Sequence, residues 1–230
     1  MALAEAIGES TEVALDVLAR VRQRTTPVVL ARDRALPVLP ALELLLPDGL
    51  RRGAVHAVDG GPGATTLALA LTVAASIDGS WTAVVGAPSL GLLSALELGV
   101  APERLLVVPE PRRESWATVV AALVDAVDLV LMRAVRVAPG EARRLVARAR
   151  ERESVLVALP ERGRVDWPGV DVRLTVERSS WTGPCEYGAG RLMARQADVI
   201  AGGRGAAARP RRARLWLPGP DGTVVSHERA

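Results

Sequence analysis

The residues from Val58 to Thr66 have the order of a phosphate-binding loop, but alanine stands where its cation belongs. In the pattern G-x-x-x-x-G-K-[ST], backbone N–H groups hold the phosphates, the lysine reaches the β- and γ-phosphates, and the hydroxyl binds Mg²⁺. Gly63 and Thr65 fit this pattern, whereas Val58 replaces the first glycine and Ala64 replaces the lysine. We therefore predict a nucleotide-binding fold that does not hydrolyse nucleotide.

No other lysine can replace the missing one, because the 230 residues contain no lysine and Lys and Arg together number 29, all of them arginine. The wide planar guanidinium of arginine does not fit the space of a compact ammonium. Two interpretations of Gly60, Gly61, Pro62 and Gly63 remain. Free N–H groups at the start of the following helix would attract an anion, or the segment is a tight turn that Pro62, which lacks a donor, makes stiffer.

The loop opens a region in which short apolar runs alternate with helical patterns. Runs typical of buried strands cover residues 55–58, 82–85, 105–108, 129–132 and 154–159. Helical patterns cover residues 65–77, 90–98, 114–127 and 139–150. Continuously apolar strands separated by helices are typical of a mostly parallel sheet covered on both faces. This pattern predicts an open α/β sheet with its ligand chemistry at the carboxyl ends of the strands.

Beyond residue 171 the pattern changes to strands without helices, at residues 172–176, 191–200, 212–217 and 223–225. Glycine- and proline-rich loops separate them, one of which is expected to hold Trp181 and Thr182. These are signals of hairpins, so we predict an antiparallel C-terminal extension of the same sheet.

The first 45 residues are predicted to form an N-terminal helix and a linker, and residues 46–230 the core domain, whose antiparallel strands occupy residues 171–230. Apolar side chains recur at helical spacing within residues 3–24, which predicts an amphipathic helix. Packing on its own domain and self-association with a neighbouring subunit both remain open for this helix. Residues 26–49, rich in proline, are expected to be extended, with one short helix at residues 41–46.

Composition limits the class of protein. At 49% apolar residues, the chain needs neither a metal nor a disulfide to build a core. A net charge of +3 does not indicate a strongly basic protein.

The single cysteine, Cys185, excludes an internal disulfide and suits a reducing compartment. The N-terminus has no basic leader, and the apolar runs are too short to span a bilayer, so we expect a cytoplasmic location and no membrane partner.

Three segments together resemble the RecA core. Residues 46–55, followed by the altered loop and residues 65–69, look like the entry to that core, where a short glycine-rich stretch leads into the first core strand. Residues 98–108 are similar to the segment after its second core strand, and residues 127–132 resemble its Walker B strand. The resemblance covers about residues 46–132 and implies a RecA-like fold.

The resemblance fails at each chemical position. The phosphate-loop lysine falls on Ala64, the Walker B aspartate on Arg133, and the glutamate that activates water near Ala87. Phosphoryl transfer depends on positioning and electrostatic stabilisation, so loss of all three implies a protein without a catalytic residue, a metal site or a required cofactor.

Within the RecA superfamily, this short and degenerate version most resembles the ImuA-type proteins of bacterial mutagenesis cassettes. The resemblance implies an accessory role in damage-induced translesion synthesis. The implied partners are an ImuB-like inactive relative of Y-family polymerases and, indirectly, an error-prone C-family DNA polymerase. Two alternatives remain: a RecA-fold inhibitor of cell division similar to SulA, and an ATPase that uses arginine in an atypical loop.

Seven further residues are candidates for contacts with a partner or nucleic acid. Trp181, in its expected loop, is hard to bury locally and is a candidate hot spot for a protein partner. Trp167 either stacks on a base or packs in the core. The densest basic stretch consists of Arg204, Arg209, Arg211, Arg212 and Arg214. These arginines either contact phosphates or form a solvated hairpin, so direct DNA binding remains open.

Overall fold

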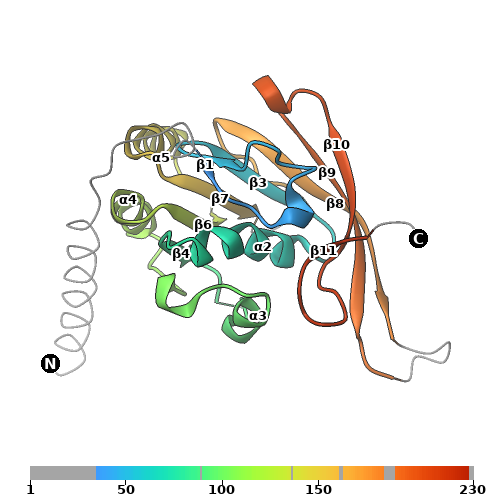
Figure 1. The fold of residues 1–230 in the computed structure, drawn as a ribbon. Helices are drawn as coiled ribbons and strands as arrows, with labels where there is room; N and C mark the ends of the chain where they lie inside the picture. Colours follow the sequence, from blue (N-terminus) through green and yellow to red (C-terminus); the bar gives the residue numbers. More distant parts are fainter. Residues whose placement is uncertain (1–34, 89, 136, 161–162, 184–189, 228–230) are drawn as a thin grey trace, which may run out of the picture. The chain divides into compact units, whose positions relative to one another are not determined.

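The computed structural model describes residues 35–227, apart from residues 89, 136, 161–162 and 184–189 (Figure 1). The helix predicted at residues 3–24 and Cys185 lie outside these described residues. Among the helices that are described, none is both long and apolar enough to cross a bilayer.

A nine-stranded sheet in the order β11-β10-β9-β8-β3-β7-β6-β4-β5 forms the centre of the fold (Figure 1). Its parallel part contains β3 (Val55–Gly60), β4 (Thr82–Val85), β5 (Leu105–Val108), β6 (Leu129–Ala134) and β7 (Val155–Pro160). β8 (Val170–Thr182) runs parallel to β3, and β9 (Ala194–Gly203), β10 (Arg211–Trp216) and β11 (Val225–Ser226) follow as antiparallel strands. The predicted α/β fold with an antiparallel C-terminal extension is confirmed.

Helices pack on both faces of the parallel strands. α2 (Ala64–Ile77) and the short α3 (Leu92–Glu97) share one apolar cluster with alternate residues of the strands, including Leu129 and Leu131 of β6. The side chains between them, Val130 and Met132, are also buried and face the other side. There α4 (Trp116–Ala126) contacts β6 and α5 (Pro139–Arg152) contacts β7.

The segment before β3 closes the core on the α2 side. β1 (Ala35–Leu36) pairs with β2 (Leu50–Arg51), and the 3-10 helix η2 (Pro40–Leu42) lies between them. This helix is shorter and begins earlier than the one predicted at residues 41–46, because Pro40 starts the turn and residues 43–45 continue it only as turns. Two more 3-10 turns, η3 (Pro102–Arg104) and η4 (Gly205–Ala207), connect later elements.

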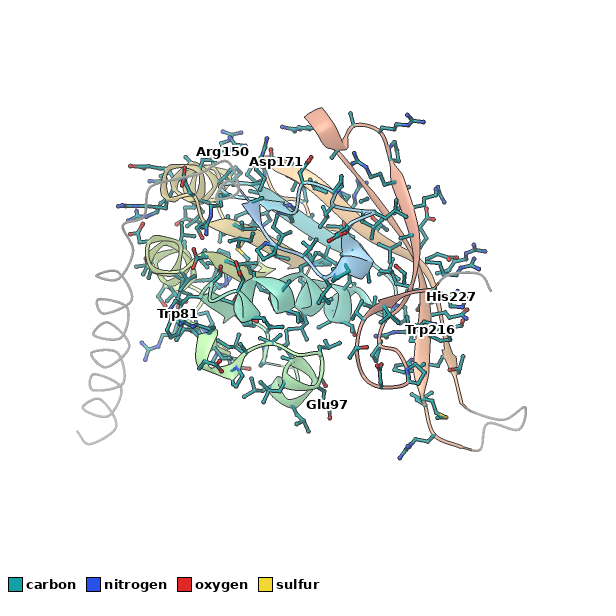
Figure 2. All side chains as sticks on the ribbon, in the orientation of Figure 1. Trp81, Glu97, Arg150, Asp171, Trp216 and His227 are labelled. Atoms are coloured by element: carbon teal, nitrogen blue, oxygen red, sulfur yellow. The ribbon has the colours of Figure 1, made fainter. Side chains whose placement is uncertain are left out.

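Carboxylates fix the amino ends of several strands. Asp171, at the start of β8, accepts a hydrogen bond at Oδ2 from the backbone N–H of Val55 (3.0 Å). Its Oδ1 lies 3.6 Å from Arg51 Nη2 and 3.8 Å from Arg150 Nη2 (Figure 2). Asp128, before β6, accepts from the backbone N–H of Trp81 (2.9 Å). These contacts align neighbouring strands, so that their opposite ends meet at a common edge of the sheet.

The end of β8 differs from the prediction. Trp181 and Thr182 belong to the strand, where they pair with Arg195 and Ala194 of β9, so the loop prediction is wrong for these two residues. The backbone pairing with β9 decides the structure here, since Met193 N–H also donates to Thr182 O (2.9 Å). The glycine at position 183 has a φ of +114° and ends the strand.

Candidate functional site

The phosphate-loop corner connects β3 to α2 through residues whose glycines are required by backbone geometry. Gly60 has a φ of +109°, and a Cβ there would lie 2.3 Å from the carbonyl oxygen of Val176 in β8. Gly63 has a φ of +114° and is the N-cap of α2. Both conformations favour glycine, so these residues are explained by the turn and by the close approach of β8.

Arg195 of β9 lies directly against this corner. Its Nη2 donates to Thr66 Oγ1 (2.6 Å), and its Nε donates to the carbonyl oxygen of Leu217 (2.7 Å). A Cβ on Gly63 would lie 3.4 Å from the same Nε. The residue is only 8% exposed, and burial lowers the pKa of its guanidinium. A cation from a distant strand therefore fills the space beside the loop.

Trp181 covers the other side of this guanidinium. The Cζ atom of Arg195 lies 4.8 Å from the centroid of the Trp181 ring, at a distance typical of a cation–π contact. The two residues are direct partners in the β8–β9 register. Trp181 keeps 39% exposure, so part of its surface stays accessible while one contact is already made within the chain.

The carboxylate closest in sequence to the loop is engaged in holding the chain together. Asp59, at the end of β3, is 4% exposed and accepts from the backbone N–H of Val165 at Oδ1 (2.7 Å). Its Oδ2 forms an ion pair with Arg173 and lies 3.8 Å from Arg164 Nε. Across the described residues there is no group of three side chains able to hold a metal ion.

The positions expected for Walker B and for the catalytic glutamate lie on the same edge of the sheet. Arg133, near the end of β6, is partly buried and its Nη1 donates to the carbonyl oxygen of Pro160 at the end of β7 (3.2 Å). Ala87, just after β4, is buried at 4% exposure. At these two positions the sheet edge therefore has a partly buried arginine and a buried methyl group.

Trp167 is a packing residue. It is 8% exposed, and its ring meets that of Trp116 edge-on, with centroids 5.8 Å apart and planes inclined by 65°. These contacts, and the hydrogen bond from the backbone N–H of Val165 to Asp59, favour the packing interpretation of Trp167 over stacking on a base.

The basic stretch divides into two groups. Arg212 and Arg214 lie on β10, where Arg212 Nη1 is 2.9 Å from Glu177 Oε2 and Arg214 Nε is 2.7 Å from Asp198 Oδ1. Arg211, at the start of β10, is partly buried, and Arg204 and Arg209 are exposed around the turn that precedes it. The carboxylate partners of the strand arginines belong to β8 and β9 and not to the phosphate-loop corner.

Arg195 is the residue that sequence reasoning missed, because its contact with Thr66 spans 129 positions. A signal was present. Alternation along β9 places Arg195 on the same face as Ala197, Val199 and Ala201, all of which are buried. An arginine on a core-facing position of a strand needs polar acceptors, and Thr66 and Leu217 supply them.

The order of strands and the corner at the end of β3 define a RecA-like α/β protein. The crystal structure of the RadB recombinase superposes with a TM-score of 0.54 at 15% sequence identity, covering 82% of this chain and 97% of that one. At this identity the likeness establishes the fold.

Residues 44–169 match the family model described as the MT3502 N-terminal domain, and the chain belongs to this family. An uncharacterized protein of Mycobacterium tuberculosis, Rv3395c, is 38% identical over 114 residues, which are 49% of this chain and 53% of that protein. The chain thus matches about half the length of this curated relative.

Proposed function

We propose that this chain is a non-catalytic, ImuA-type accessory protein of an error-prone translesion synthesis complex in the DNA-damage (SOS) response. The observation that carries the non-catalytic part is the corner itself, where Arg195 is packed against Gly63 and Thr66 while Ala64 replaces the lysine. The RecA-like fold, which the chain shares with the RadB recombinase, supports the RecA-related part of this proposal.

The charges at the corner argue against hydrolysis. A transferring phosphoryl group requires a lysine and a Mg²⁺ ion held by carboxylates. Arg133 brings positive charge to the edge where Mg²⁺ would need a carboxylate, and Asp59 is already paired with Arg173. The protein therefore acts by binding and not by a chemical step.

We infer that its partners are an ImuB-like inactive relative of Y-family polymerases and, through it, an error-prone C-family DNA polymerase. The adaptor would work in the cytoplasm, where the replication machinery is found. Binding energy would come from apolar and arginine-rich patches on a rigid sheet, with exposed aromatic residues such as Trp181 as candidate contacts.

Nucleotide chemistry is tested with the purified full chain. Phosphate release from ATP and GTP with Mg²⁺, and the shift of the thermal midpoint on adding nucleotide, should both be absent. The matched control is Thr65→Ala at the position of the Mg²⁺-binding hydroxyl, which separates intrinsic activity from a contaminating ATPase. Saturable hydrolysis that Thr65→Ala abolishes would show that the chain is an enzyme.

The partner is tested by co-purification from cells exposed to a DNA-damaging agent. The expected result is recovery of a Y-family-like protein without catalytic carboxylates, together with a C-family polymerase. Recovery of a tubulin-like division protein without polymerase components would contradict the proposal and favour the inhibitor of cell division.

A further inference from the structure

The face of the C-terminal sheet formed by β8, β9 and β10 carries a hollow of about 290 Å³ lined partly by charged residues. Its charged and polar lining consists of Glu177, Arg178, Asp198, Arg212, Arg214 and His227. The arginine side chains are 80%, 69% and 40% exposed for positions 178, 212 and 214, so the other described residues leave this face open to solvent.

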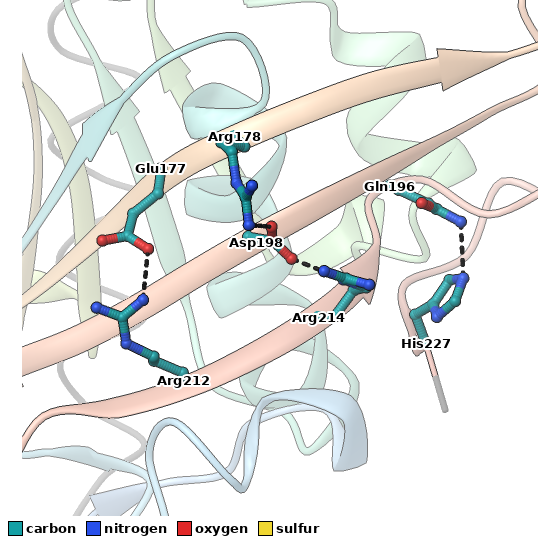
Figure 3. A network of polar contacts seen from close by, with 7 residues as sticks. All are labelled: Glu177, Arg178, Gln196, Asp198, Arg212, Arg214 and His227. Carbon is teal, nitrogen blue, oxygen red and sulfur yellow. Dashed lines mark hydrogen bonds and ion pairs between the residues drawn. The ribbon is translucent and has the colours of Figure 1, made fainter. Parts of the chain in front are cut away.

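Carboxylates on the same face hold these guanidinium groups in place. Asp198 contacts Arg178 Nη2 through Oδ2 (2.8 Å) and Arg214 Nε through Oδ1 (2.7 Å), and Glu177 Oε2 contacts Arg212 Nη1 (2.9 Å) (Figure 3). The hydrogen bond from Arg214 is the main reason why the pKa of Asp198 lies below its usual value. Each arginine uses one nitrogen in these pairs, which leaves its other two nitrogens as oriented donors.

The arginines give this face its positive charge. Among the lining residues, Arg178, Arg212 and Arg214 face Glu177 and Asp198, so the formal charges sum to +1 with His227 neutral. In each ion pair the arginine side chain is more exposed than its carboxylate partner, at 80% against 23%, 69% against 37% and 40% against 23%. A ligand attracted to this face therefore carries negative charge.

The mixture of signs on this face favours one class of anionic macromolecule. Nucleic acid presents one phosphate per nucleotide in a continuous series, and such a series would bring negative charge over Glu177 and Asp198 as well as over the arginines. An acidic protein segment can place carboxylates opposite the guanidinium groups, where they bind bidentately, and uncharged residues opposite Glu177 and Asp198. At the border of the hollow, Trp216 and His227 lie ring against ring with centroids 5.0 Å apart, next to Gln196, and add an aromatic surface (Figures 2 and 3).

We propose that this face of β8, β9 and β10 is the docking surface for a short acidic segment of a protein partner. The inference deepens the proposed adaptor function and rests on it. The arginines hold the carboxylates of the segment, and Glu177 and Asp198 keep the guanidinium groups oriented and repel a continuous phosphate chain.

The test compares two double substitutions in the full chain, Arg212→Glu with Arg214→Glu, and Arg143→Glu with Arg144→Glu. The second pair lies on the exposed face of α5 and changes the net charge by the same amount. The probes are a fluorescein-labelled twelve-residue peptide with six glutamates and a twelve-nucleotide oligo-dT, each followed by fluorescence anisotropy. We expect the β10 pair to weaken peptide binding by about tenfold or more, and the α5 pair to change it by less than about twofold.

Three results would overturn the docking proposal: no binding of the peptide by the wild-type chain, equal loss in both double variants, or tighter binding of oligo-dT than of the peptide. If the β10 pair does not fold, Arg178→Glu takes its place, since this side chain is 80% exposed, and it should weaken binding by about threefold. The assay contains no polymerase component, so its failure leaves the adaptor role standing. If the peptide binds but no polymerase component co-purifies, the adaptor role fails while the docking surface stands.

Discussion

Arg195 places its positive charge at the N-terminus of α2, which is already the positive end of the helix dipole. Neutral acceptors offset this unfavourable arrangement, because Thr66 Oγ1 and Leu217 O take two of its N–H groups and the Trp181 ring covers the guanidinium plane. Within the described part of the chain, no carboxylate is paired with it. The residue therefore belongs to the packing of the corner as much as to its electrostatics.

Replacing Arg195 with alanine should destabilise the protein by about 2–3 kcal/mol, because hydrogen bonds to charged groups contribute on that order and Thr66 and Leu217 would lose their donor. Urea unfolding followed by circular dichroism measures the change. The exposed Arg143→Ala on α5 serves as the control and should stay within about 0.5 kcal/mol of the wild type. Equal stability of Arg195→Ala and wild type would show that the side chain does not hold the corner.

His56 makes stability depend on pH. Burial lowers its pKa to about 4 from the usual 6.5 of histidine, and its Nδ1 has no hydrogen-bond partner among the described residues. Between pH 6.5 and 4 the unfolded state binds the proton and the folded state does not, so the stability falls as the pH is lowered. We expect a loss of about 2 kcal/mol between pH 7 and pH 5, measured by urea unfolding. In His56→Val this part of the loss should disappear; an unchanged pH profile would assign it to other groups.

At the scale of elements, the contact between the end of β3 and strand β8 gives a matched pair of substitutions. A Cβ at Gly60 would lie 2.3 Å from Val176 O, whereas one at Gly61 would meet nothing within 4 Å. Gly60→Ala should cost about 2–4 kcal/mol, since it adds a backbone clash to the strain of a positive φ, and Gly61→Ala should be close to neutral. Thermal unfolding of the two variants measures the difference, and similar midpoints would mean that the end of β3 moves away from β8 without a cost in stability.

The sequence predicted the parallel part of the fold well, because buried strands and helices there have local patterns of apolar residues. The strands at residues 82–85 and 105–108 have the predicted bounds, and α2 begins one residue before its prediction. The position at which β8 ends, and therefore whether Trp181 lies in a strand or a loop, depends on pairing with β9. Local sequence patterns do not show this pairing. Ala64 and Arg133 were identified from the sequence as altered positions, and Arg195 was not. Alternation along β9 places Arg195 on the core-facing side, but its partner Thr66 lies in α2, 129 positions away.

At the scale of the whole molecule, one apolar cluster joins the N-terminal linker, α2 and the last strands. Its members run from Leu36 to Val224 and include Leu50, Leu131 and Leu215. The antiparallel strands thus share a core with the parallel part. Strand β10 therefore packs on this common core through Leu215, while Arg212 and Arg214 are exposed.

Removal of residues 1–33 tests whether this core is self-sufficient. Residues 34–230 form a compact unit of their own, and the cluster begins at Leu36, so a chain starting at Arg34 should unfold cooperatively with a thermal midpoint within about 2 °C of the full chain. Circular dichroism measures the midpoint, and sedimentation of both chains measures their mass. Self-association is one of the two alternatives that remain open for residues 3–24. If it depends on these residues, the full chain should form an oligomer and the shorter chain should be a monomer. The same oligomeric state in both chains would exclude that role for residues 3–24. A thermal midpoint of the shorter chain that is lower by about 5 °C or more would show that residues before Leu36 contribute to the core.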